Sequence, residues 1–454
     1  MAMLSTIRDV EYRVVVLHPA SRMLLAFKRD GVWRIPRLMV PQGKRPSLHV
    51  QAALDSMWGM SVFVVDYLSI PTTDGACVVA ELLREPTSDG MAAVRADELD
   101  PADLHEAERV GLQHILADAV ANSIGHIGWI DEAIAWVEDT TGERGLSKCD
   151  IEQHNAGGGF ALLRMRSLSG HSYWLKATGF PNAHERGITR TLARVCSSLP
   201  GCSRHVPMIL AERADWNAWL MKESASSQAL PQSEAESLKA VCGIASALAV
   251  LQQATLPYVD QFLSSGACDH RHAHLRAMTP ALFTYLHVVL DALDERSSND
   301  AERLRFLEEA SLDILERLEA SPIPTALVHA DLNWGNILLV PHPQFIDWSE
   351  TYIGNPATSL NQLIALFQSA FPLLGDRLCL AAREAYLSDW KGFSIADWRD
   401  NLHYAQVTSL LTLLFGRFHW MSSESNIPRP DGRYLRFLTE KLYDAVTSQK
   451  AVLA

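Results

Sequence analysis

Residues 327–348 read LVHADLNWGNILLVPHPQFIDW and are the most informative part of this 454-residue chain. The polar loop places His329, Asp331 and Asn336 in the spacing H-x-D-x-x-x-x-N, and Asp347 follows in the strand-like FIDW. Phosphoryl transfer requires a carboxylate beside the attacking hydroxyl and hard oxygen ligands for Mg²⁺. The segment therefore predicts a kinase-like centre in which Asp331 orients the hydroxyl, while Asn336 and Asp347 hold the metal.

A simpler interpretation of the same residues is a polar turn between two strands, because Asp and Asn are common in turns. It does not explain why a histidine, two carboxylates and an amide occur together at this spacing. The full set favours a catalytic loop.

The loop HADLNWGN followed by IDW resembles the catalytic loop of the aminoglycoside phosphotransferase and choline kinase-like family, a branch of the protein-kinase fold. Protein kinases usually carry Arg and Lys where this chain has Ala330 and Asn333, and Phe-Gly where it has Trp348 and Ser349. Both departures favour a small-molecule hydroxyl acceptor over a protein. The resemblance implies that His329 orders the catalytic loop rather than acting as a base.

Residues 148–223 follow the order of a small, β-rich nucleotide-binding lobe: two strands around a glycine turn, a strand with a lysine, a helix and a hairpin. Lys176 in SYWLKA is expected to bind the nucleotide phosphates, and Glu185 is expected to hold it in place. Two structural alternatives stay open. Lys176 suits an ordinary strand lysine, and Glu185 forms an N-x-x-E capping pattern with Asn182.

Two further nucleotide contacts are predicted from position in this lobe. Gly157, Gly158 and Gly159 lie where a glycine turn would cover the phosphates, since glycine permits close backbone approach. Such a run also suits a flexible turn. Met221 and Glu223 lie at the candidate hinge, where backbone groups would meet a purine, although ATP and GTP are not distinguished by these residues.

Residues 1–118 resemble a Nudix domain, with strands, a W-x-x-P segment, a glycine and a helix that ends in glycine. A catalytic Nudix helix carries several Glu residues that bind magnesium. Between Gly43 and Gly59 this chain has a single acid, Asp55, and no Glu. Pyrophosphate hydrolysis is therefore disfavoured, and the segment is interpreted as a degenerate Nudix-like α/β domain that packs against the kinase or senses a ligand.

The predicted fold is α+β, a two-lobed protein-kinase-like fold preceded by this separate α/β domain. A linker helix is expected in residues 119–147. The small lobe would occupy residues 148–223, and a large helical lobe that carries the catalytic loop would occupy residues 224–454.

The net charge of −13 disfavours binding to nucleic acid or anionic membrane, and it is compatible with a cationic acceptor. Seven scattered cysteines without a C-x-x-C motif indicate reduced thiols rather than a disulfide framework. No signal peptide core is visible, and no apolar run approaches the roughly 20 residues that span a membrane. A cytoplasmic protein is expected, and its oligomeric state is not indicated.

Two groups of polar residues have less specific interpretations. The run CDHRHAH at 268–274 allows a metal site, but a solvated histidine-rich insertion explains it better, because no second cluster completes a tetrahedral site. Several acids in the helical part could meet a substrate amine or simply be solvated: Glu350, Asp376, Asp389, Asp397 and Asp400.

These observations predict a magnesium-dependent kinase that transfers the γ-phosphate of ATP or GTP to a small-molecule hydroxyl. The alternative is a regulatory or scaffolding pseudokinase that binds nucleotide without useful transfer. Lys176, Asp331, Asn336 and Asp347 are all intact, which favours the enzyme, since a pseudokinase commonly loses at least one of the equivalent residues.

Overall fold

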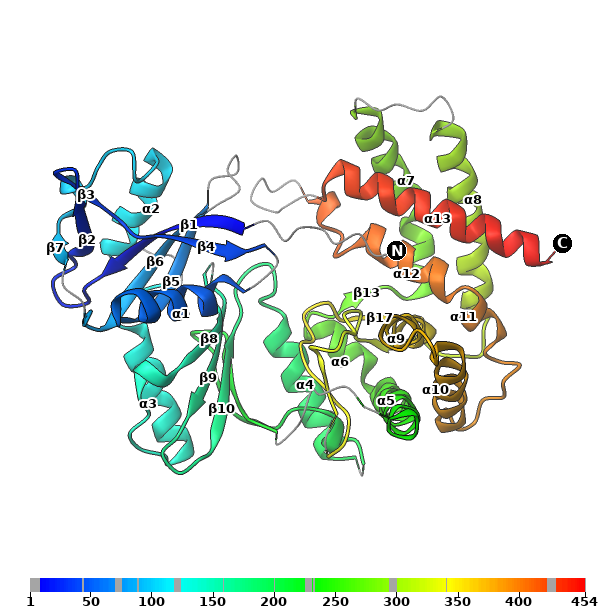
Figure 1. The fold of residues 1–454 in the computed structure, drawn as a ribbon. Helices are drawn as coiled ribbons and strands as arrows, with labels where there is room; N and C mark the ends of the chain where they lie inside the picture. Colours follow the sequence, from blue (N-terminus) through cyan, green and yellow to red (C-terminus); the bar gives the residue numbers. More distant parts are fainter. Residues whose placement is uncertain are drawn as a thin grey trace. The chain divides into compact units, whose positions relative to one another are not determined.

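The computed structural model describes residues 9–42, 45–69, 76–87, 90–117, 124–157, 159–199, 201–224, 231, 233–293, 300–339, 341–422 and 430–453. Contacts divide the chain into two compact units. The first unit comprises residues 1–186 and 208–223, and the second comprises residues 187–207 and 224–454. Figure 1 labels most of the elements of each unit.

The first unit begins with a seven-stranded mixed sheet in the order β3-β2-β1-β6-β5, with β4 paired to β1 and β7 to β2. The β1–β6 pair is parallel, whereas β1 pairs with β2 and β4 in antiparallel fashion. The strands are β1 (Asp9–Leu17), β2 (Leu24–Arg29), β3 (Val32–Arg34), β4 (Arg37–Pro41), β5 (Ser61–Ser69), β6 (Ala76–Arg84) and β7 (Met91–Val94).

Helices cover both faces of this sheet (Figure 1). Because side chains alternate along a strand, Val14 and Val16 of β1 pack in the cluster of α1 (Pro46–Trp58), and Val15 packs in that of α2 (Glu106–Leu116). The glycine that ends α1 as a left-handed cap was expected from the sequence, whereas Gly43 lies outside the described residues.

The second sheet of this unit has five antiparallel strands in the order β11-β12-β10-β9-β8. Its strands are β8 (Glu152–Asn155), β9 (Ala161–Arg166), β10 (Ser172–Ala177), β11 (Ile209–Arg213) and β12 (Ala218–Lys222). The strand order along the chain agrees with the predicted small lobe.

Helix α3 (Trp129–Thr141), which falls in the predicted linker, lies in one hydrophobic core with both sheets. The centroid of the Trp129 ring lies 5.9 Å from that of Phe63 of β5 and 5.4 Å from that of Trp216. Leu175 of β10 belongs to the same buried cluster. The contacts thus place the predicted Nudix-like domain, linker and small-lobe sheet in one compact unit. The proposed boundaries stay predictions.

The second unit is mainly helical and contains two small sheets, in the orders β13-β17-β14 and β15-β16. Its helices are α4 (Glu185–Ser197), whose first two residues belong to the first unit, α5 (Glu234–Thr255), α6 (Val259–Ser264), α7 (His272–Asp291), α8 (Asp300–Glu319), α9 (Ala357–Ala370), α10 (Gly375–Asp389), α11 (Arg399–His403), α12 (Ala405–Phe415) and α13 (Gly432–Leu453). Its strands are β13 (Cys268–Asp269), β14 (Ala326–Val328), β15 (Ile337–Leu338), β16 (Gln344–Phe345) and β17 (Tyr352–Gly354).

Three expectations from the sequence change in this unit. The first is that no apolar run approaches the length of a membrane span. Among the described residues, the helical stretch Glu234–Ser264 is long and apolar enough to cross a membrane, although Leu248 and its apolar neighbours lie in the buried core. Cys196 and Cys202 form a disulfide, so the expectation of reduced thiols is wrong for this pair.

The third change concerns the histidine-rich run. His270 and His272 are only 3% and 4% exposed, so the expectation of a solvated insertion is wrong. Burial lowers the pKa of both imidazoles to about 4. Over the described part of the chain, no group of three or more His, Cys, Asp or Glu could hold a metal ion.

Candidate active site

A short hairpin in the second unit brings Asn336 and Asp347 together. Strands β15 and β16 pair so that Ile337 lies opposite Phe345, and the Ile346 N–H donates to the Asn336 carbonyl at 3.0 Å. Asn336 therefore lies opposite Ile346, immediately before Asp347. Residues far apart in the sequence segment become neighbours because the hairpin folds back.

The Asp331 carboxylate is held by two side-chain amides. Asn336 Nδ2 donates to Asp331 Oδ2 at 2.8 Å and to the Asp331 carbonyl at 2.9 Å. Asn333 Nδ2 donates to Asp331 Oδ1 at 3.0 Å. Since Asn336 uses its nitrogen here, its Oδ1 is the atom left to ligate a cation. The carboxylate, which is partly exposed, keeps lone pairs that can accept a hydroxyl proton.

Asn333 is a site residue whose role the sequence did not reveal. Besides its bond to Asp331, its Oδ1 accepts the Gly335 N–H at 2.8 Å, which fixes the side chain across the loop. The pattern resembles an Asx-turn. An Asn two residues before a glycine is the sequence signal that could have indicated it.

His329 joins the catalytic loop to the segment that precedes Asp347. It is fully buried, its Nε2 bonds to the Ile346 carbonyl at 2.9 Å, and its Nδ1 accepts the Asp331 N–H at 3.3 Å. These partners assign the proton to Nε2. Its ring packs 4.5 Å from that of Trp348. Both nitrogens meet backbone groups, so His329 positions the loop.

Two non-glycine residues of the site have left-handed backbone conformations. Ala330 has φ of 68° and Asp347 has φ of 65°. Such outliers cost about 1 kcal/mol or more and cluster at functional sites. Gln362 Nε2 donates to the Ala330 carbonyl at 3.1 Å, and Ser349 Oγ donates to Asp347 Oδ1 at 3.2 Å. Hydrogen bonds from neighbouring side chains therefore hold the chain at both Ala330 and Asp347.

Among the acids considered as amine contacts, Glu350 interacts electrostatically with this loop. Desolvation raises the pKa of its carboxyl, and the negative charges of Asp331 and Asp347 raise it further, while Arg417 lowers it. The net shift is upward. Glu350 is exposed by its solvent-accessible area, although the protein atoms around its carboxyl are dense enough to desolvate it.

Lys176 and Glu185 form a buried ion pair in the first unit. Lys176 lies on β10 between β9 and β12, and its Nζ lies 2.5 Å from Glu185 Oε1. The two residues are 5% and 1% exposed. The Glu185 N–H donates to the Asn182 carbonyl at 3.0 Å, while the Glu185 carboxylate meets the lysine. The predicted pair is thus brought together.

The glycine turn is partly described. Gly157 and Gly159 have φ of 90° and 83°, and the Phe160 N–H donates to the Gly157 carbonyl at 2.9 Å. Gly158 lies outside the described residues. A Cβ at position 157 would lie 2.6 Å from the Tyr67 ring, so this glycine is required by packing within the first unit.

The candidate hinge groups are largely occupied within the sheet. Met221 pairs with Trp174 of β10, and the Glu223 N–H donates to the Ser172 carbonyl at 2.9 Å. Burial raises the pKa of the Glu223 carboxyl. Hydrogen bonds, chiefly from Arg164, lower this pKa by a larger amount, so the net shift is downward. The Glu223 N–H is therefore not open to a purine.

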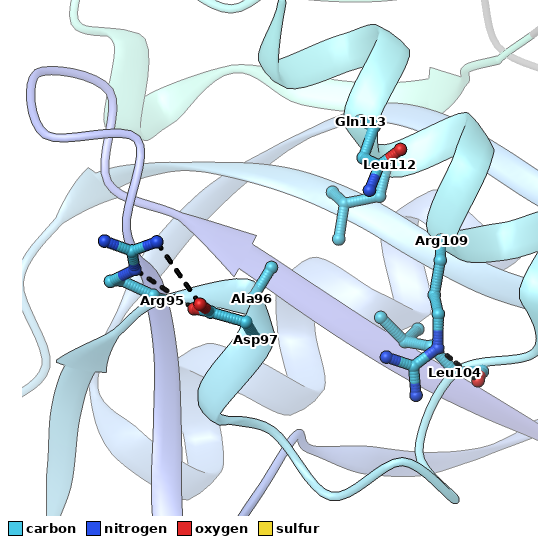
Figure 2. A pocket seen from close by; sticks show the side chains of 7 residues that line it. All are labelled: Arg95, Ala96, Asp97, Leu104, Arg109, Leu112 and Gln113. Carbon is cyan, nitrogen blue, oxygen red and sulfur yellow. Dashed lines mark hydrogen bonds and ion pairs between the residues drawn. The ribbon is translucent and has the colours of Figure 1, made fainter.

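A cavity of about 340 Å³ lies elsewhere in the first unit, beside α2 and the 3₁₀ turn η1 (Ala96–Glu98). Figure 2 shows Arg95 paired with Asp97, and Arg109 bonded to the Leu104 carbonyl. None of the predicted site residues lines it. The lining residues are Arg95, Ala96, Asp97, Leu104, Arg109, Leu112 and Gln113.

Residues 189–398, which include the catalytic loop but neither Lys176 nor Glu185, match the model of the phosphotransferase enzyme family. No curated protein matches the chain. Among solved structures, a macrolide 2′-phosphotransferase from Brachybacterium faecium is 16% identical, with 68% of this chain and 98% of that chain covered and a TM-score of 0.44. Plasmodium vivax ethanolamine kinase is 14% identical, with coverages of 76% and 97% and a TM-score of 0.44. An aminoglycoside phosphotransferase from Alicyclobacillus acidocaldarius is 14% identical, with coverages of 66% and 91% and a TM-score of 0.40.

Proposed function

From the family match over residues 189–398, we propose that this chain is a small-molecule kinase. It transfers the γ-phosphate of ATP or GTP to a hydroxyl of the acceptor and depends on Mg²⁺. The observation that carries the proposal is the Asp331 carboxylate, which two amides hold inside the matched segment.

Asp331 accepts a hydrogen bond from the acceptor hydroxyl and aligns its oxygen with the γ-phosphorus. The bond between that oxygen and phosphorus forms while the bond to the β,γ-bridging oxygen breaks, and the nucleoside diphosphate leaves. The hydroxyl proton passes to Asp331 or to solvent. Positioning supplies most of the catalysis, because phosphoryl transfer has a loose transition state.

Asn336 and Asp347 fit a magnesium site, since an amide oxygen and a carboxylate are hard ligands. Magnesium commonly takes one or two protein ligands and completes its shell with phosphate oxygens and water. When bound, the metal neutralises charge on the phosphates. Lys176, held by Glu185, is proposed to bind phosphate oxygens.

Glu185→Gln is expected to raise the KM for nucleotide by about tenfold, because the flexible lysine loses the charge that fixes its ammonium group. Steady-state kinetics and the thermal unfolding temperature would be measured together. Glu106→Gln, which makes the same change at an exposed position of the first unit, serves as the control. A folded Glu185→Gln protein with the wild-type KM for nucleotide would remove the pair from the site.

The proposed reaction is tested by a mass-shift screen. The full chain is incubated with Mg–ATP or Mg–GTP and a panel of hydroxylated metabolites and antibiotics, and products that gain one phosphoryl group are sought. Nucleotide binding without any modified acceptor would instead support the pseudokinase alternative. Absence of both binding and transfer would reject the proposal.

A further inference from the structure

Two sheet-edge strands of the first unit are joined through a buried side chain. Strand β5 ends the first sheet, and β8 ends the second. Edge strands expose backbone groups that need partners. Gln153 of β8, which is 0% exposed, donates from Nε2 to the Val64 carbonyl at 2.7 Å, and its Oε1 accepts the Val64 N–H at 2.7 Å. A side-chain amide thus takes the place of a strand residue.

A second glutamine strengthens the same connection. Gln51 of α1 donates from Nε2 to the Val62 carbonyl at 3.0 Å, and its Oε1 accepts the Gln153 N–H at 3.2 Å. The backbone and the side chain of Gln153 are therefore both fixed by residues of the N-terminal sheet and its helix. Such paired bonds in a buried setting leave β8 little freedom.

Gly157, the first glycine of the turn, comes two residues after the end of β8 and lies against the same edge strand. A Cβ at Gly157 would lie 2.6 Å from Tyr67 Cδ2 and 3.1 Å from Asp66 Oδ1, so this glycine is close to β5. The Tyr67 hydroxyl is 2.8 Å from Oγ of the buried Ser47, which fixes the ring. Burial raises the pKa of Tyr67 to about 12, so the hydroxyl stays neutral.

We propose that the N-terminal sheet is a fixed support for the glycine turn, and that Gln153 and Tyr67 are positioning residues for nucleotide binding. The inference rests on the proposed function, because the glycine turn can contact phosphates only if the protein binds a nucleotide. Backbone amides bind an anion well when their directions are set in advance. The support gives residues 1–118 a function that needs no Nudix glutamates.

Tyr67→Ala is expected to speed amide hydrogen exchange at residues 155–157 and 159–160 and to weaken Mg–ATP binding about tenfold, since small displacements of binding groups are costly. Tyr67→Phe keeps the ring against the turn and should restore most of both properties. Exchange is followed by mass spectrometry and binding by calorimetry, with the full chain.

Gln153→Met, which keeps the side-chain length without the amide, provides a second variant in case Tyr67→Ala does not fold. Met57→Ala, at an exposed position of α1, is the control and should resemble wild type. Wild-type exchange and affinity in a folded Tyr67→Ala or Gln153→Met protein would overturn the proposal, as would faster exchange without weaker binding. If the wild-type chain itself fails to bind Mg–ATP, the proposed function fails, whereas the exchange measurement still decides whether the sheet supports the turn.

Discussion

Asp331→Asn is expected to lower kcat for phosphoryl transfer by at least about a hundredfold, the range that a positioned general base contributes. The substitution keeps the size and planarity of the side chain but replaces one oxygen with an NH₂ group. That group cannot accept the proton of the acceptor hydroxyl. Single-turnover kinetics with Mg–ATP and a responsive acceptor would measure the loss.

The same substitution should leave Mg–nucleotide binding nearly intact. The two carboxylate oxygens accept separately from Asn333 and Asn336, and an amide can serve only one of these donors. One hydrogen bond worth about 1 kcal/mol is therefore lost. Asn336 also donates to the Asp331 carbonyl at 2.9 Å, which keeps its Oδ1 oriented for the metal.

Asp313→Asn provides the matched control, because it makes the same isosteric change at an exposed position of α8 in the same unit. It should retain wild-type kcat and nucleotide affinity. Turnover by Asp331→Asn equal to wild type would contradict the proposed role of this carboxylate. Loss of nucleotide binding along with turnover would instead make Asp331 part of the metal site.

The hairpin around the catalytic loop could be predicted from the sequence because its signals are local. Short apolar segments bracket the polar residues, and they form β14, β15 and β16, the last of these at the strand-like FIDW. The Lys176–Glu185 pair was also accessible, since a strand followed by a helix brings residues nine positions apart together. In both cases one connection between neighbouring elements determines the geometry.

Contacts between distant segments could not be predicted in this way. Gln153 looks like an ordinary polar strand residue, yet its amide bonds to Val64, which is 89 positions away. His270 looks solvated in a polar run, yet it is buried, and its ring packs against those of Tyr352 and Phe418. Periodicity describes which face of an element is apolar, but it does not identify the partner that covers a polar atom. The occupied Glu223 N–H belongs to the same class.

Asp347→Asn is expected to raise the magnesium concentration needed for half-maximal nucleotide binding by at least about a hundredfold. Even indirect changes at metal sites cost ten- to a hundredfold in affinity. A neutral amide replaces the only carboxylate proposed to hold the metal, and magnesium favours charged oxygen ligands. Asparagine is preferable to alanine for this test. Position 347 has φ of 65°, and Asn adopts this conformation readily, whereas Ala would add backbone strain.

The experiment is a magnesium titration of ATP binding, in which the metal concentration for half-maximal binding is compared with wild type. Ser349→Ala is the graded control, because it removes the hydroxyl that donates to Asp347 at 3.2 Å but keeps the carboxylate. Its effect should be about tenfold, the low end of the range for indirect changes and well below that of Asp347→Asn. An unchanged magnesium requirement in Asp347→Asn would exclude this residue as a ligand. If Asp347→Asn instead lost kcat alone, while Asp331→Asn lost magnesium affinity, the two carboxylates would exchange their proposed roles.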